Sequence, residues 1–322
     1  MKRYASIGCA LLALSVPAPQ ALAADHPARP VRVVVPLTPA SGADIAARVV
    51  GRQLQDIWKQ MVVIDNRPGA GGQIGTQIVV RAAPDGHTLL VQSSSHAVNP
   101  AIYKNLPYDS TRDLVDVACL GSTPYVMITA PAGPYRPLKA LIAAARAKPG
   151  EVAFASAGIG TSTHITGEYF AQTAGVKLLH VPFKGSNEAI GDVVAGRVAF
   201  YMAPVSTAIG FIRDNRLAVL GVASPRRISM LPNVPTIAEQ GFPGFEMDVW
   251  FGAWAPAATP RPVLQKIAAD IRTAVDTREV RDQYEKLGME PTPLFLADFA
   301  KFVRAEMSKY QQVVKRADIQ PM

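Results

Sequence analysis

Cysteine, charge and long apolar runs are all scarce in this 322-residue chain. Only Cys9 and Cys119 carry thiols, and charged residues make up 18% of the sequence, too little for a disordered chain. Beyond the N-terminus no run of eighteen apolar residues occurs, so no transmembrane helix is expected. The 49% hydrophobic content is that of a globular protein with its own core.

A dense basic block is also missing, although the formal net charge is +8. Nucleic-acid interfaces need clustered Lys and Arg side chains with aromatic residues among them, so no nucleic-acid partner is expected. A small anionic ligand agrees with the sign of the charge.

Residues 1–23 have the pattern of a secretory signal peptide. Two basic residues precede an uncharged apolar stretch from Tyr4 to Val16, and Ala21-Leu22-Ala23 supplies a cleavage site of small residues. The stretch is too short to span a membrane. Cleavage after Ala23, or one residue later, removes Cys9. The exported chain then keeps only Cys119 and forms no internal disulfide.

Apolar runs alternate with helical patterns along the mature chain. Strands are expected at 31–37, 61–64 and 88–91, and helices at 45–57 and 73–83. This alternation predicts a parallel sheet with right-handed crossovers. It resumes with helices at 138–147, 161–173, 186–195 and 206–213, and with strands at 152–155, 178–181, 198–201 and 217–222.

Two loose segments, 121–131 and 241–256, separate the α/β units and are expected to act as hinges. The chain ends in helical patterns at 263–275 and 299–314, which must pack onto an existing unit. Two crossings imply that the first unit contains both chain ends. We expect an α/β fold with a parallel-dominated mixed sheet in each lobe and a C-terminal helical tail. The expected lobes are 24–123 with 250–322, and 124–249.

Motifs for metal binding, nucleophilic catalysis and phosphate binding are absent. No two of the five histidines have ligand spacing, and neither G-x-S-x-G nor G-K-[ST] occurs. Cys119 stands among apolar residues and is interpreted as a core residue. The glycines at 69–72 lack the full dinucleotide fingerprint and are interpreted as a turn. No metal or cofactor is expected, while a triad assembled from distant segments stays open.

Small hydroxyl residues and glycines follow the expected strands, directly before helices. Such loops lie at 38–42, 93–96, 156–164 and 183–187. Helix N-termini offer free N–H groups and a positive dipole, and in a parallel sheet these loops share the carboxyl edge. Ser41 and Asp44 also have the spacing of a capping box. Each loop alone fits a helix cap, but the set in two lobes favours an anion-binding cleft.

For two residues in these loops, the sequence allows two interpretations each. His164 either donates to a carboxylate or is a satisfied helix residue. Lys184 is either a charge partner for an anion or an ordinary exposed lysine.

Five segments form a recognisable series: DNRPGAGG at 65–72, PDGHTL at 84–89, HVPFKG at 180–185, LPNVPT at 231–236 and GFPGFE at 241–246. Together they resemble the signatures of the tripartite tricarboxylate transporter receptor family, also called Bordetella uptake gene (Bug) proteins. The similarity runs in order from about Pro30 to the C-terminus, and the combination of motifs is specific.

This resemblance implies a periplasmic binding protein fold of type II, with two α/β lobes around a Venus-flytrap cleft. It implies that a monomer without enzymatic activity captures a small organic acid in the periplasm for inner-membrane transporter subunits or a sensor kinase. In the family, backbone groups and bridging waters hold the carboxylate at a loop that usually reads Pro-Gly-Gly-x-x-Asp. Here residues 39–44 read Pro-Ala-Ser-Gly-Ala-Asp, so the glycine pair is only partly kept.

The loops and the resemblance together define a set of expected ligand-binding residues. They are Thr38, Pro39, Ala40, Ser41, Asp44, Ser93, Ser94, Ser95, Ser156, Ala157, Gly158, Thr161, His164, Lys184 and Ala203.

Two alternatives are kept. An exported hydrolase would use Ser94 or Ser156 as its nucleophile, and ester hydrolysis lost in Ser156→Ala would favour it. The effector domain of a transcription regulator can share the two-lobed fold. That domain needs a DNA-binding helix-turn-helix ahead of it, where this sequence has the signal pattern.

Overall fold

The computed structural model describes residues 26–320, so the expected signal peptide lies outside the described part of the chain. The strands are β1 (Val31–Val35), β2 (Val62–Asn66), β3 (Thr88–Ser93), β4 (Leu114–Thr129), β5 (Ala153–Ser156), β6 (Leu179–Pro182), β7 (Phe200–Pro204), β8 (Ala218–Val222) and β9 (Asp248–Pro256). The helices are α2 (Gly42–Trp58), α3 (Gln73–Val80), α4 (Ser95–Ile102), α5 (Leu138–Ala147), α6 (Ser162–Ala174), α7 (Ser186–Val194), α8 (Val205–Arg213), α9 (Arg261–Asp276), α10 (Arg278–Leu287) and α11 (Ala297–Arg316).

The sheet of lobe 1 is centred on β1, an apolar strand interrupted only by Arg32. β1 pairs in parallel with β2 and β3, and β3 continues antiparallel to β9. α2 packs on this sheet because its buried residues recur at helical spacing, from Ala43 through Val50 and Leu54 to Trp58. The parallel β-α-β order expected from the sequence is confirmed here.

The sheet of lobe 2 is built in the same way, with parallel neighbours on both sides of a central strand, β5. β5 pairs in parallel with β6 and β7, and β7 continues antiparallel to β4, whose other edge holds β8. Aromatic rings fill the space between this sheet and α6: Phe154 stacks on Phe200, and Phe170 meets Phe200 edge-on.

β4 joins the two lobes into one nine-stranded mixed sheet. Residues 114–124 of β4 pair with β9, and residues 125–129 pair with β7 and β8. Residues 121–129 and 248–256 are strand, so the expectation that these segments are loose is wrong, whereas their role as hinges stays a prediction. These two segments pair although they are far apart in sequence, and such pairing leaves no local pattern.

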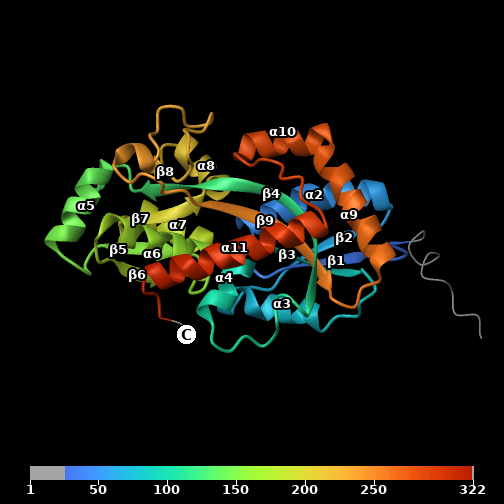
Figure 1. The fold of residues 1–322 in the computed structure, drawn as a ribbon. Helices are drawn as coiled ribbons and strands as arrows, with labels where there is room; N and C mark the ends of the chain where they lie inside the picture. The colour runs from blue at the N-terminus through green and yellow to red at the C-terminus, as the bar shows by residue number, and fades with distance from the viewer. Residues whose placement is uncertain (1–25, 321–322) are drawn as a thin grey trace, which may run out of the picture.

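The C-terminal helices wrap back over both lobes (Figure 1). α9 packs on α2, and α11 lies along α4 of lobe 1 and reaches α6 of lobe 2. α10 was not expected, because only Val280 and Tyr284 are buried on it and its apolar signal is correspondingly weak.

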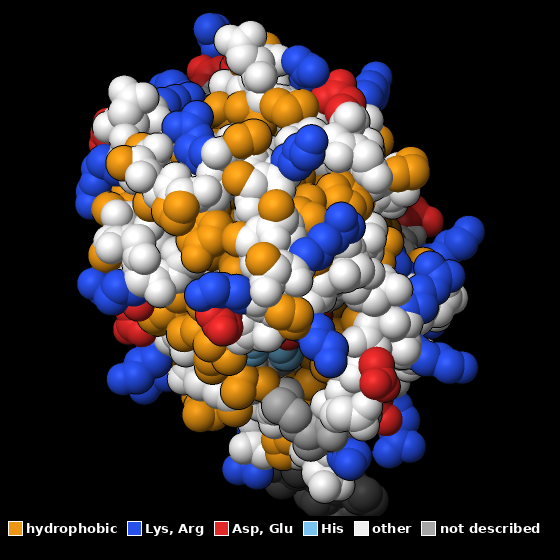
Figure 2. All heavy atoms as spheres, turned by 90° about the vertical axis from the view of Figure 1, so that its left-hand side faces the viewer, with side chains coloured by type: hydrophobic (Ala, Val, Ile, Leu, Met, Phe, Trp, Pro, Cys, Tyr) orange, Lys and Arg blue, Asp and Glu red, His pale blue; other side chains and the backbone are white. Residues whose placement is uncertain are grey.

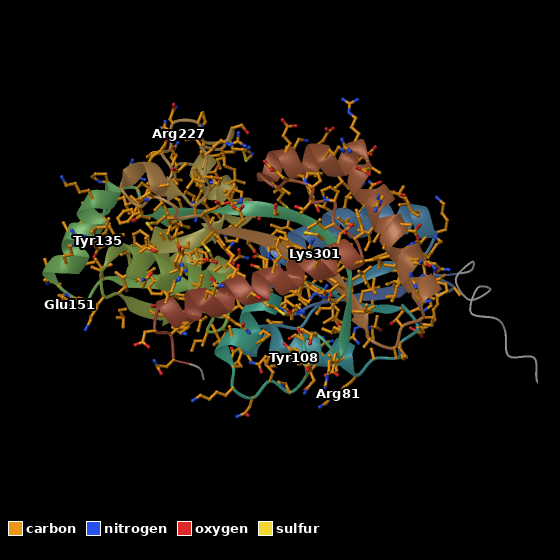
Figure 3. All side chains as sticks on the ribbon, viewed as in Figure 1. Arg81, Tyr108, Tyr135, Glu151, Arg227 and Lys301 are labelled. Carbon is orange, nitrogen blue, oxygen red and sulfur yellow. The ribbon has the colours of Figure 1, made fainter. Side chains whose placement is uncertain are left out.

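Surface and core are divided as expected of a globular chain. Within residues 26–320 no helix is both long and apolar enough to cross a membrane. Charged side chains such as Glu151 and Arg227 project outward (Figure 3). On the face in Figure 2, Lys and Arg side chains are spread among apolar atoms and form no single block. Cys119 is buried in β4, and this burial raises the pKa of its thiol to about 12, which confirms the core interpretation.

Candidate ligand-binding site

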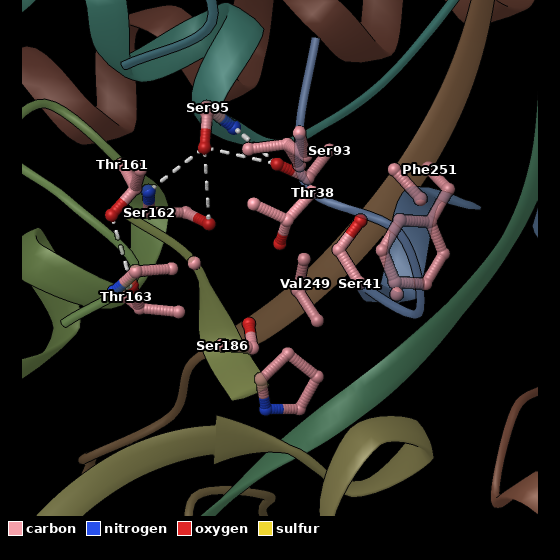
Figure 4. Close-up of a pocket in the computed structure, with 16 residues that line it drawn as sticks. Thr38, Ser41, Ser93, Ser95, Thr161, Ser162, Thr163, Ser186, Val249 and Phe251 are labelled. Atoms are coloured by element: carbon pink, nitrogen blue, oxygen red, sulfur yellow. Dashed lines mark hydrogen bonds between the residues drawn. The ribbon is translucent and has the colours of Figure 1, made fainter. Parts of the chain in front are cut away.

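A small cavity lies between the lobes, where loops follow the strands of both (Figure 4). Its lining residues are Leu37, Thr38, Ser41, Gly42, Ala43, Ser93, Ser95, Ala157, Thr161, Ser162, Thr163, Gly185, Ser186, Pro204, Val249 and Phe251.

Several helices begin at this cavity. α2 and α4 of lobe 1 and α6, α7 and α8 of lobe 2 each contribute a cap or first-turn residue to its lining. The first N–H groups of a helix have no partner inside it, and the helix dipole adds partial positive charge there. Among the described residues no charged side chain lines the cavity. An anion would therefore be held by hydrogen bonds and helix dipoles, without an ion pair.

A hydrogen-bonded chain of hydroxyl groups connects the lobes beside the cavity. Ser95 Oγ accepts from Ser162 N at 2.9 Å and from Ser93 Oγ at 2.9 Å. Tyr125 Oη donates to Ser162 Oγ at 2.7 Å. These groups are largely satisfied by one another, as the dashed lines of Figure 4 show, so they fix the shape of the wall.

Two hydroxyl groups on the lobe 1 side remain available to a ligand. Thr38 Oγ1 is buried and has no hydrogen-bond partner within the described residues. Ser41 Oγ accepts from Asp44 N at 3.4 Å as the N-cap of α2, so its proton stays free to be donated. Both hydroxyls point into the cavity (Figure 4). A buried hydroxyl without a partner costs free energy, and a ligand oxygen that accepts from it removes that cost.

An apolar part of the lining comes from β9, next to Ser41 (Figure 4). Val249 and Phe251 line the cavity, and the Phe251 ring lies directly against the backbone of Gly42. A Cβ atom at position 42 would lie 2.5 Å from Phe251 Cζ, so only glycine leaves room for the ring. This wall suits the carbon skeleton of a small ligand.

The structure brings part of the expected set to the cavity. The expected residues that line it are Thr38, Ser41, Ser93, Ser95, Ala157 and Thr161. Those that do not line it are Pro39, Ala40, Asp44, Ser94, Ser156, Gly158, His164, Lys184 and Ala203. The lining residues outside that set are Leu37, Gly42, Ala43, Ser162, Thr163, Gly185, Ser186, Pro204, Val249 and Phe251. Gly42, Ser162, Thr163, Gly185 and Ser186 lie in the loops that were expected to form the cleft. Most of these are neighbours of expected residues, so the helix starts carried a usable signal.

Asp44 organises the loop after β1. Its carboxylate accepts from Ala40 N at 2.8 Å, from Arg48 Nε at 2.9 Å and from Asn66 Nδ2 at 3.0 Å. Ala40, where the family pattern has glycine, takes a left-handed φ of 60°. That conformation disfavours a side chain, so the Asp44 contact to its N–H stabilises a strained turn.

The other expected residues have positions that the fold itself explains. Lys184 is exposed, and its backbone N–H donates to Glu188 Oε2 at 3.2 Å, which agrees with the ordinary-lysine interpretation. Ala203 is buried in the core around β7, and Ser94 is buried at the start of α4.

A cluster of His164, Glu168 and His180 lies behind the cavity, with its potential metal-ligating atoms within 4.8 Å of one another. The two imidazole rings stack with centroids 4.0 Å apart and planes inclined by 17°. An ion bound by two imidazoles lies in the plane of both rings, so stacked rings cannot share one without rearranging. Burial lowers the pKa of His164 to about 4 and, with the nearby His164, that of His180 to about 3. The arrangement is that of a neutral stacked pair.

Ser156 was the candidate nucleophile of the hydrolase alternative. Its Oγ lies 2.7 Å from His180 Nε2 and accepts from Gly158 N at 3.1 Å. Ser156 is fully buried and does not line the cavity, and the lowered pKa of His180 makes that ring a poor general base. The pair holds the turn after β5, so this geometry does not support the hydrolase alternative.

Comparison with known proteins identifies consistent relatives. The family model described as "Tripartite tricarboxylate transporter family receptor" matches residues 46–319. The "UPF0065 protein in tcbD-tcbE intergenic region" of Pseudomonas sp. strain P51 is 40% identical over 292 residues, covering 89% of this chain and 86% of the relative. Protein BugT of Bordetella pertussis is 36% identical over 314 residues, covering 97% of this chain and 96% of the relative.

Solved structures agree in fold. A structure of an R. palustris protein with adipate matches with a TM-score of 0.89 at 28% identity, over 92% of this chain and 100% of that one. MatC from Rhodopseudomonas palustris with bound malate matches with a TM-score of 0.84 at 29% identity, over 89% of this chain and 99% of that one. The periplasmic binding protein BugD matches with a TM-score of 0.87 at 28% identity, over 92% of this chain and 100% of that one.

Proposed function

Because the chain belongs to the tripartite tricarboxylate transporter receptor family, a family of periplasmic solute-binding proteins, we propose that it captures a small carboxylate in the cavity between its lobes. The protein acts by binding and release, without chemistry of its own. It passes the carboxylate to inner-membrane transporter subunits or presents it to a sensor kinase, as a monomer in the periplasm.

The observation that carries this proposal is a cavity lined by helix N-termini and hydroxyl groups and, among the described residues, by no charged side chain. Helix N-termini from both lobes point at one cavity in which Thr38 Oγ1 has no partner within the described chain. A carboxylate oxygen accepts such hydrogen bonds and is stabilised by the dipoles. A neutral ligand would gain less from this arrangement.

We assign the two ends of the ligand to different walls. The carboxylate accepts from the hydroxyls of Thr38 and Ser41 and from the first N–H groups of α2, while Val249 and Phe251 contact the carbon skeleton. Similar proteins have been solved with adipate and with malate, which agrees with a ligand of this size and charge. Lobe 1 (24–123 with 250–322) and lobe 2 (124–249) then close on it at the β4 and β9 crossings.

The test is a thermal-shift screen of mono-, di- and tricarboxylates, including adipate, malate and nicotinate, on protein refolded to remove carried-over ligand. A compound present at about 100 times its dissociation constant should add about 2.7 kcal/mol to the free energy of unfolding. The absence of any shift across the panel would contradict the proposal.

A substitution of Thr38 tests where the carboxylate binds. Thr38→Val keeps the side-chain volume but removes the unpaired hydroxyl, so we expect carboxylate affinity to fall about tenfold in titration calorimetry. The stability of the ligand-free protein should stay the same or rise, because a buried unsatisfied group is lost. Unchanged affinity would place the carboxylate elsewhere.

A further inference from the structure

Tyr103 connects the lobes at a point outside the cavity. It directly follows α4 in lobe 1, and its Oη donates to the backbone oxygen of Ile159 in lobe 2 at 3.0 Å. Tyr103 is not a lining residue, and neither is Ile159. Ile159 nevertheless belongs to the β5–α6 loop, whose residues Ala157 and Thr161 do line the cavity. The contact therefore holds the β5–α6 loop, which forms part of the cavity wall, at a residue that does not itself line the cavity.

The Tyr103 ring fits between two glycines, one from each lobe. A Cβ atom at Gly160 would lie 2.6 Å from Tyr103 Cζ, and one at Gly71 would lie 2.7 Å from Tyr103 Oη. Gly71 also approaches the Ile159 oxygen, since its Cβ would lie 2.8 Å from that atom. Gly160 has a φ of +77°, which fits glycine best, so the loop is shaped for this approach.

This packing contrasts with another exposed contact that crosses between the lobes. Asn187 Nδ2 donates to Pro39 O at 3.3 Å, from an exposed side chain. Tyr103 instead offers a rigid ring with a single hydroxyl, and ordering it costs little conformational entropy. A bond of this kind can hold two bodies in one relative position.

We infer that Tyr103 is a positioning residue that stabilises the closed arrangement of the lobes and the shape of the β5–α6 loop. This inference rests on the proposed function, in which closure accompanies binding of a carboxylate. Since the contact forms only when the lobes are together, it stabilises the closed, ligand-bound state relative to the open state and slows release. Since Tyr103 does not touch the ligand, its loss should weaken every ligand by the same factor.

The experiment compares wild type with Tyr103→Phe, using adipate and malate as probes in stopped-flow and equilibrium binding. We expect dissociation rates to rise roughly two- to tenfold for both probes, with association rates nearly unchanged. The matched control is Tyr284→Phe, which removes a phenol hydroxyl that donates to Leu120 O at 2.9 Å within lobe 1. That variant should lower the melting temperature and leave the dissociation rates alone.

A readout without ligand separates this inference from the proposed function. Spin labels at two exposed positions, Arg52→Cys on α2 and Lys139→Cys on α5, report the distance between the lobes. Tyr103→Phe should shift the ligand-free distribution toward longer distances, and Tyr284→Phe should not. If wild type binds neither probe, the distance distribution alone decides on Tyr103, while the full carboxylate panel decides on the proposed function. An unchanged distribution with unchanged dissociation rates would overturn the inference.

Discussion

One small residue decides how closely the lobes approach. Gly185, at the start of α7, faces lobe 1, and a Cβ there would lie 2.7 Å from Thr38 Cγ2. Its φ of −177° is ordinary extended backbone, so alanine fits the local conformation without strain. The missing side chain therefore serves the contact between lobes and not the turn itself.

We expect Gly185→Ala to fold normally but to bind carboxylates at least about tenfold more weakly, because the added methyl holds the lobes apart. Titration calorimetry with the best compound of the screen measures this loss. Gly191→Ala, on α7 with nothing within 4 Å of the added carbon, is the control and should keep full affinity. It should also gain up to about 1 kcal/mol of stability from helix propensity. Equal affinity in both variants would contradict the role given to Gly185.

The polar lining residues of the cavity could be predicted from the sequence better than the apolar ones. Ser41, Ser95 and Thr161 were foreseen because a hydroxyl before a helix has a recognisable purpose. Val249 and Phe251 were not, because an apolar residue in a strand is the same in sequence whether it faces a core or a ligand. His164 allowed two interpretations from the sequence, and in the structure its ring is buried and stacks on His180.

The strand β9 carries an unusual carboxylate next to the crossing between lobes. Asp248 Oδ1 is buried without a hydrogen-bond partner within the described residues. Burial, followed by the charge of Glu246, raises the pKa of Asp248 to about 6. Glu290 and Glu306 act in the same direction, and Lys309 opposes them. The carboxyl is therefore partly protonated in mildly acidic solution.

This pKa links stability to pH. Because the folded protein binds the proton more tightly than the unfolded chain, ionisation destabilises the fold as pH rises from about 4 to about 6. We expect Asp248→Asn to be more stable than wild type by about 2 kcal/mol at pH 8 and to show no difference at pH 3.5. Urea denaturation at both pH values measures this.

A second variant checks the cause. Glu246→Gln removes the strongest charge that raises the Asp248 pKa, so the benefit of Asp248→Asn at pH 8 should shrink in that background. A benefit of Asp248→Asn that persists at pH 3.5 would show that packing, and not ionisation, is responsible.

Helices and most strands were largely predictable, but the crossing strands β4 and β9 were not. α5 occupies the expected residues 138–147, because its apolar residues recur at helical spacing and Pro149-Gly150 stops it. β4 and β9 pair with partners far along the chain, and their glycine and proline content resembled a linker. The information that makes them strands lies in their partners and not in their own sequence.

The two lobes share one continuous β-sheet. β4 pairs with β9 along one part and with β7 and β8 along the rest, and α11 packs on both lobes. Losing either lobe would leave β4 half unpaired and expose the apolar side of α11.

We therefore expect one cooperative unfolding transition in calorimetry, with equal calorimetric and van't Hoff enthalpies, despite the two-lobed shape. Adding the bound carboxylate should move this single transition upward as a whole. Two resolved transitions, or a ligand shift confined to one of them, would show that the lobes unfold separately.

The low reactivity of Cys119 is useful for labelling experiments. With its sulfur enclosed in β4 and its ionisation suppressed, this residue does not compete for maleimide or methanethiosulfonate reagents. Any cysteine introduced on the surface of residues 26–320 is then modified in preference to Cys119. Opening and closing can be followed by fluorescence or spin resonance in protein that is otherwise unaltered.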